Sequence, residues 1–109
     1  MNEPDCFVGI DVSKARLDCA MGEQGEVIEL ANSEAQLGQL VERLRALAPA
    51  LVVLEASGGY ERLAVAHLGA AGLPVVVVNP RQVRAYAKAC GILAKTDVID
   101  ARLLARFAA

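Results

Sequence analysis

Two short, uninterrupted apolar runs constrain the fold of this chain more than any other feature. Leu51–Leu54 and Pro74–Val78 contain no polar residue. Such runs are typical of strands that are covered on both faces, as in parallel sheets flanked by helices. Between them, Tyr60–Ala71 is predicted to be a helix, and Gly72 is a suitable residue to follow its C-terminus. The sequence therefore predicts a β-α-β unit with parallel strands.

The segments on either side of this unit complete the predicted fold. The first third contains three short strand-like runs separated by turns, which predict an antiparallel meander: Phe7–Asp11, Arg16–Met21 and Glu26–Leu30. An apolar stripe then appears at helical spacing after the capping-box pair Ser33 and Gln36: Leu37, Leu40, Val41, Leu44 and Leu47. Asn79 and Pro80 suit the start of a helix through about Cys90, and Asp97–Phe107 is the last predicted helix. The order β-β-β-α-β-α-β-α-α predicts an α/β mixed sheet with helices on both faces.

Length and composition fit one globular domain. The chain has 109 residues, of which 55% are hydrophobic, and its apolar runs are far too short to cross a bilayer. It shows no signal peptide. Its three cysteines are an odd number at no metal-ligand spacing, so we expect buried free thiols in a reducing cytoplasm. The apolar helical run Leu103–Ala109 has no stop signal, and we expect residues 1–109 to be a truncated part of a longer protein.

Charge is distributed unevenly along the chain. Residues 1–78 carry five basic and eleven acidic side chains, a net charge of −6, whereas residues 79–109 carry six basic and two acidic ones, a net charge of +4. A basic C-terminal third indicates either an anionic partner or a solvated helix face. Arg81, Arg84 and Lys88 have the spacing of one helix stripe, and we predict that they contact nucleic-acid phosphates.

Two acids lie at the predicted carboxyl ends of strands. Asp11 ends the first strand and Glu55 follows the buried run Leu51–Leu54, so on neighbouring strands their carboxylates would converge. Two carboxylates so close repel each other unless a cation or a proton intervenes, and Mg²⁺ and Mn²⁺ prefer oxygen ligands. Asp97 and Asp100 would share a helix face, although acids in a first helical turn also suit the helix dipole.

Three segments resemble the signature blocks of a known family, the DEDD transposases of insertion sequences and related DNA invertases. These segments are Gly9-Ile10-Asp11-Val12-Ser13-Lys14, Leu54-Glu55-Ala56-Ser57-Gly58-Gly59-Tyr60-Glu61 and Lys95-Thr96-Asp97-Val98-Ile99-Asp100-Ala101, and Asn79-Pro80-Arg81-Gln82-Val83 is also similar. The resemblance implies a ribonuclease H-like (RuvC-like) catalytic domain that cleaves and rejoins DNA. The family's four acids fall on Asp11, Glu55, Asp97 and Asp100, which by this resemblance would hold Mg²⁺ or Mn²⁺.

The resemblance also implies partners and a missing part. Members carry a C-terminal domain with a serine implicated as nucleophile, and some use a structured guide RNA to choose DNA sites. That region is absent from these 109 residues, so we expect the isolated chain to have weak activity at most. Recombination needs two or more active sites, which predicts a homo-oligomer for the full-length protein. Lys14, Lys95 and Arg102 are further candidates for phosphate contact.

Other residues and other classes of protein remain as alternatives. Asp18 is predicted to be exposed in mid-strand, and Glu61 is a second candidate ligand that better suits a helix N-terminus. The opening strand, Asp11 and hairpin also fit an actin-like or sugar-kinase-like ATPase lobe, although the later Gly-rich turns of that fold are not found. The remaining alternative is a non-catalytic nucleic-acid-binding module, in which the acids are only surface charge.

Overall fold

A computed structural model describes residues 6–22, 25–91 and 100–109. It contains the predicted elements in the predicted order. The strands are β1 (Phe7–Val12), β2 (Arg16–Ala20), β3 (Val27–Ala31), β4 (Leu51–Glu55) and β5 (Val75–Val78). The helices are α1 (Glu34–Leu47), α2 (Arg62–Ala70), α3 (Pro80–Ala89) and α4 (Ala101–Ala108).

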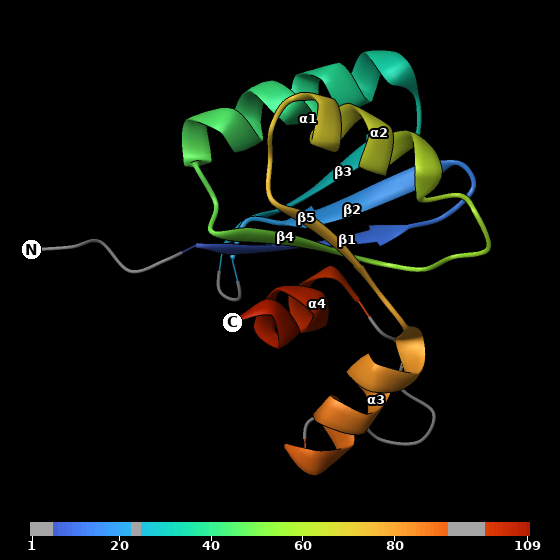
Figure 1. The fold of residues 1–109 in the computed structure, drawn as a ribbon, viewed down its shortest axis with the longest axis vertical. Coiled ribbons are helices and arrows are strands. Elements are labelled where there is room, and N and C mark those ends of the chain that lie inside the picture. The colour runs from blue at the N-terminus through green and yellow to red at the C-terminus, as the bar shows by residue number, and fades with distance from the viewer. Residues whose placement is uncertain (1–5, 23–24, 92–99) are drawn as a thin grey trace, which may run out of the picture.

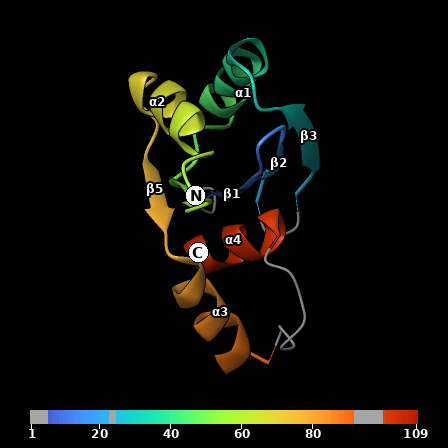
Figure 2. The same cartoon turned by 90° about the vertical axis from the view of Figure 1, so that its right-hand side faces the viewer.

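One mixed sheet organises the molecule, with strand order β3-β2-β1-β4-β5. β1, β2 and β3 pair in antiparallel fashion, as predicted for the meander, and β4 joins β1 and β5 in parallel. Helices α1 and α2 cover one face, and α4 crosses the other, with α3 extending beyond α4 (Figures 1 and 2). The prediction of an α/β sheet with helices on both faces is confirmed.

The helix starts follow the predicted capping signals. The Ser33 hydroxyl accepts a hydrogen bond from the Gln36 N–H at 3.4 Å at the start of α1. The Asn79 side chain accepts one from the Arg81 N–H at 2.9 Å at the start of α3, with Pro80 as the first helical residue. Each cap satisfies a backbone donor that has no partner inside the helix.

Alternation along the strands divides the core between the two faces of the sheet. Val8, Ile10 and Val12 point into the larger core beneath α1 and α2, where four residues of the predicted α1 stripe are buried. Its last residue, Leu47, was predicted to join them but is exposed at the end of the helix. On the opposite face Val53 packs against Leu104 in a smaller core. Every second residue of β1 and β4, including Asp11 and Glu55, therefore faces α4.

Two expectations about burial and one about a helix start need correction. Pro74–Val78 was predicted to be covered on both faces, but β5 is the edge strand, and Val76 and Val77 are 43% and 42% exposed. Tyr60 precedes α2 instead of opening it, and its side chain is 48% exposed. The cysteines are free, but only Cys19 is buried, whereas Cys90 is exposed. Burial raises the pKa of the Cys19 thiol to about 12, which keeps it protonated at neutral pH.

No helix in the described part of the chain is both long and apolar enough to cross a membrane.

Candidate active site

Four carboxylates stand side by side on the face of the sheet that α4 covers. Asp11 on β1 is the cross-strand partner of Asp18 on β2, which is the partner of Glu29 on β3. On the other side, Ile10 pairs with Leu54, so the residues that follow, Asp11 and Glu55, end up adjacent on β1 and β4. We call Glu55, Asp11, Asp18 and Glu29 the acidic row. Like charges on directly opposite residues destabilise a sheet, so the row needs neutralisation.

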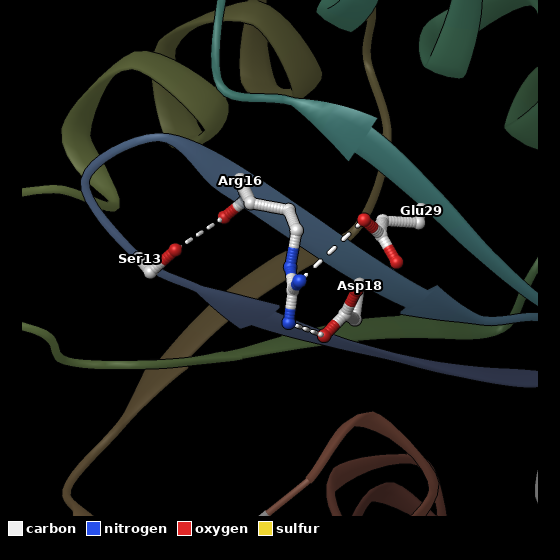
Figure 3. A network of polar contacts seen from close by, with 4 residues as sticks. All are labelled: Ser13, Arg16, Asp18 and Glu29. Carbon is white, nitrogen blue, oxygen red and sulfur yellow. Dashed lines mark hydrogen bonds and ion pairs between the residues drawn. The ribbon is translucent and has the colours of Figure 1, made fainter.

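Arg16 partly neutralises the outer half of the acidic row. Its guanidinium lies between Asp18 and Glu29, at 3.5 Å from a carboxylate oxygen of each (Figure 3). The carbonyl of Arg16 also accepts hydrogen bonds from the Ser13 N–H and hydroxyl, which closes the turn between β1 and β2. Within the described residues, by contrast, no ion pair joins Asp11 or Glu55 to a basic side chain.

The electrostatics of Asp11 and Glu55 reflect this difference. Burial raises the pKa of the Asp11 carboxyl, and the nearby charges of Asp18 and Asp100 raise it further, while the charge of Arg16 partly opposes the shift. Burial likewise raises the pKa of Glu55, with Asp11 adding to the shift and Arg84 opposing it. In both residues the environment disfavours the ionised form. A bound cation would reverse this penalty.

Helix α4 approaches the sheet closely because the contacting residues are small. Ala101 and Ala105 of α4 pack with Ala20 of β2 in a buried cluster. At Gly9 of β1, a Cβ atom would lie only 2.2 Å from the Ala101 carbonyl oxygen and 2.3 Å from the Ala105 nitrogen. The absence of a side chain at Gly9 thus allows the helix backbone to rest on β1, which brings the N-terminus of α4 near Asp11.

Asp100 occupies that N-terminus, but not as predicted. It was expected inside a helix that begins at Asp97; instead α4 begins at Ala101 and Asp100 is its N-cap, with extended backbone angles. Its carboxylate accepts a hydrogen bond from the Leu103 N–H at 2.8 Å. Asp97 and Lys95 lie outside the described residues. Within residues 6–22, 25–91 and 100–109, no three Asp, Glu, His or Cys side chains are grouped so that they could hold a metal ion.

The predicted basic residues fall in several places. Arg81 and Lys88 are exposed on α3, and Lys14 is exposed in the turn after β1, whereas Arg84 is partly buried and its charge acts on Glu55. Arg102 donates a hydrogen bond to the Gly25 carbonyl at 3.2 Å. An open pocket of about 250 Å³ lies beside it, lined by Asp18, Val27, Asp100, Ala101 and Arg102.

Glu61 belongs to a loop and not to the acidic row. Its carboxylate accepts hydrogen bonds from the Ser57 N–H at 3.3 Å and from the Ser57 hydroxyl at 3.5 Å. The pKa of Glu61 is lowered, chiefly by a hydrogen bond from its own N–H and also by those from Ser57 and Gly59. Glu61 is the N-cap of α2, which confirms the predicted helix N-terminal position, and its carboxylate closes the loop that precedes the helix.

Sequence reasoning missed two features of the site. Asp18 was expected to be exposed, yet its side chain is only 26% exposed and faces Asp11. Arg16 was not singled out, although it partly neutralises half of the acidic row. The hairpin register would have revealed both, because the turn at Ser13 places Asp11 opposite Asp18. Alternation within each strand then sets Arg16 and Asp18 on one face.

The fold defines the class of protein. The chain superposes on the Thermus thermophilus RuvC structure with a TM-score of 0.58 at 17% sequence identity, over 92% of this chain and 90% of that one. At this identity the likeness shows the fold alone, and the fold is ribonuclease H-like.

The sequence defines the family. A family model described as a transposase matches residues 8–109, and the chain belongs to this family of DEDD transposases. A pilin gene-inverting protein from Moraxella bovis is 33% identical over 94% of this chain, and one from Moraxella lacunata is 45% identical over 53% of it. These matches cover 34% and 18% of the two relatives, so the chain spans about a third of their length at most.

Proposed function

We propose that this chain is the catalytic domain of a DNA transposase or invertase, which cleaves and transfers DNA strands with Mg²⁺ or Mn²⁺. The ligands would be Asp11, Glu55, Asp97 and Asp100. One observation carries the proposal: Arg16 forms ion pairs with the outer two members of the acidic row, while Asp11 and Glu55 form no ion pair with a basic side chain among the described residues. Membership of a transposase family favours this function over an ATPase lobe.

The donor set fits a hard divalent cation. Carboxylate oxygens are the ligands that Mg²⁺ and Mn²⁺ prefer, and the raised pKa values of Asp11 and Glu55 describe a site that gains from a positive charge. Two metal ions in such a site would activate the attacking oxygen and stabilise the leaving oxygen of a phosphodiester. The strand ends of β1 and β4 would hold two ligands rigidly, and the N-cap geometry would orient Asp100.

Nucleic acid would be held by the basic side chains around this face. Arg81 and Lys88 project from α3, a helix without acidic residues that lies on the same side of the sheet as the acidic row (Figure 2). Lys14 lies three residues after Asp11, in the turn that follows β1, and Lys95, Arg84 and Arg102 are further candidates. DNA is the proposed substrate, a structured guide RNA a proposed partner, and a cytoplasmic homo-oligomer the proposed full-length form. Its complete reaction would need the C-terminal serine domain.

The test of the metal site compares matched neutral variants in the acidic row. Mn²⁺ is titrated during thermal unfolding of the wild type, Asp11→Asn, Glu55→Gln and Glu29→Gln. All three variants remove one negative charge from the row, but only the first two remove a proposed ligand. We expect Mn²⁺ to raise the melting temperature of the wild type and Glu29→Gln alone, because a ligand that binds only the native state stabilises it. An equal rise in all four proteins would refute the site.

The test of nucleic-acid contact uses fluorescence anisotropy with a labelled DNA duplex and with a labelled structured RNA. Arg81→Gln and Lys88→Gln should each weaken binding and reduce its dependence on salt, because each phosphate contact releases counterions. Arg45→Gln is the matched control, since Arg45 lies on α1 across the sheet and pairs with Glu42. Equal weakening by Arg45→Gln would mean that charge alone, not this face, governs binding.

A further inference from the structure

One asparagine side chain ties together the two segments that follow Asp11 and Glu55. The Asn32 Nδ2 group donates hydrogen bonds to the Ser13 carbonyl at 3.0 Å and to the Tyr60 carbonyl at 3.1 Å. The Asn32 backbone N–H donates to the Ala15 carbonyl at 3.0 Å. Ser13 and Ala15 form the turn after β1, and Tyr60 lies in the loop after β4, so one residue bridges both.

The acceptors determine which way the amide must point. Two carbonyl oxygens can be met only by the two N–H bonds of the amide nitrogen, so the Asn32 Oδ1 atom has to face the other way. That oxygen is buried and has no hydrogen-bond partner among the described residues. Burying an acceptor in this way costs free energy. The contribution of the Asn32 side chain therefore comes from its two N–H donors, since its oxygen forms no hydrogen bond with the described residues.

Asn32 is itself held at a fixed point. It directly precedes Ser33, the N-cap of α1, and α1 is anchored by four residues of its buried stripe. The two bridged segments are also closed internally, by the Ser13 N–H to the Arg16 carbonyl at 2.9 Å and by the Arg62 N–H to the Gly59 carbonyl at 3.2 Å. A shift of either segment would thus have to break hydrogen bonds to Asn32.

We infer that Asn32 is a positioning residue that restrains the separation of the Asp11 and Glu55 carboxylates, beyond what strand pairing fixes, by clamping the β1–β2 turn to the β4–α2 loop. Its importance for metal binding rests on the proposed function. The clamp itself is a property of this fold and is tested separately.

Two variants of Asn32 and one neighbouring control test the clamp. Asn32→Ala removes both donors, and Asn32→Asp keeps the shape but presents oxygens to the two carbonyls. Ser33→Ala removes the adjacent helix cap and leaves the clamp intact. Amide hydrogen exchange is measured without metal over residues 13–16 and 56–62. We expect both segments to lose protection together in the Asn32 variants and to keep it in Ser33→Ala; unchanged protection in Asn32→Ala would overturn the clamp.

Mn²⁺ affinity, measured by electron paramagnetic resonance of the free ion, then tests the link to the carboxylates. We expect the dissociation constant to rise about tenfold in Asn32→Ala, the scale seen when outer-shell partners are lost. Asn32→Asp is the sharper variant, because an added negative charge alone would tighten binding, whereas a lost clamp weakens it. Tighter or unchanged binding in Asn32→Asp would overturn the positioning role. If the wild type binds no Mn²⁺, the proposed function fails, and the exchange data alone decide the clamp.

Discussion

A single methyl group added at Gly9 should push helix α4, which carries Asp100 at its start, away from strand β1, which carries Asp11. In Gly9→Ala the new Cβ would lie 2.2 Å from the Ala101 carbonyl oxygen, 2.3 Å from the Ala105 nitrogen and 2.8 Å from the Leu104 Cβ. Ordinary van der Waals contact begins at 3.4 Å, so α4 has to retreat by about 1.2 Å at its closest point. The two nearest atoms belong to the helix backbone and cannot rotate away.

Two measurements follow from that displacement. Overpacking of this kind costs about 1–3 kcal/mol, and at roughly 4–8 °C per kcal/mol for a domain near this size the melting temperature should fall by about 4–24 °C. Asp100 caps the first turn of α4 and must move with it, so the Mn²⁺-induced rise in melting temperature should also shrink. Thermal unfolding with and without Mn²⁺ measures both effects.

The control is a glycine where the same change meets open space. Gly38 lies within α1, and a Cβ added there has no atom within 4 Å. Gly38→Ala should therefore stabilise the protein by about 0.5–1 kcal/mol through helix propensity. Trimming Ala105→Gly should not rescue Gly9→Ala, because the clash is with the backbone nitrogen. A melting temperature for Gly9→Ala at or above that of the wild type would refute the close seating of α4 on β1.

Three further predictions concern pH and the core. The pKa of Asp11 is raised in the folded state, so ionisation of this carboxyl lowers the stability of the fold as the pH rises above 3.8 and through the folded pKa. In unfolding titrations, Asp11→Asn should therefore be more stable than the wild type at pH 7. This gain should vanish below pH 3.8. Glu61 has a lowered pKa, so Glu61→Gln should be less stable at pH 7 and match the wild type only at pH values well below 4.5. Leu104→Ala should cost about 2–5 kcal/mol in urea unfolding, because Leu104 is fully buried beneath the sheet; a loss below 1 kcal/mol would contradict the packing of α4.

The order of elements was predictable because local signals and burial agree along most of the chain. The α1 stripe up to Leu44, the Ser33 cap and the Asn79-Pro80 helix start each depend on a few neighbouring residues, and the structure places them as expected. The strand β5 was predicted correctly, but the prediction that it is covered on both faces was wrong, for a reason that is not local in the sequence. Four valines in succession have the same pattern at the centre of a sheet and at its edge, and only the strand order shows that β5 has a neighbour on one side.

Only the residues at strand ends could be placed in the candidate site from the sequence, because their position along a strand determines where they lie in the sheet. Asp11 and Glu55 follow from the rule that ligand sites form at the carboxyl ends of neighbouring strands, and the structure sets them on adjacent strands and one face. The position of Asp100 depends on how closely α4 can approach, which Gly9 determines through contacts about ninety residues away along the chain. No local pattern in the last third of the sequence contains that information.

Charge neutralisation links the fold to the proposed chemistry. A sheet that carries four carboxylates in one row would be destabilised by their repulsion, and the single positive charge of Arg16 offsets part of that cost for Asp18 and Glu29. If the row were only surface charge, a second basic residue near Asp11 would improve stability in the same way. Among the described residues, the charges of Asp18 and Asp100 raise the pKa of Asp11, and the opposing charge of Arg16 does not cancel the rise. This half of the row, in which no described ion pair is formed and burial raises both pKa values, is the physical argument for a cation between β1 and β4, since a metal would add there a positive charge like the one that Arg16 supplies to the outer half.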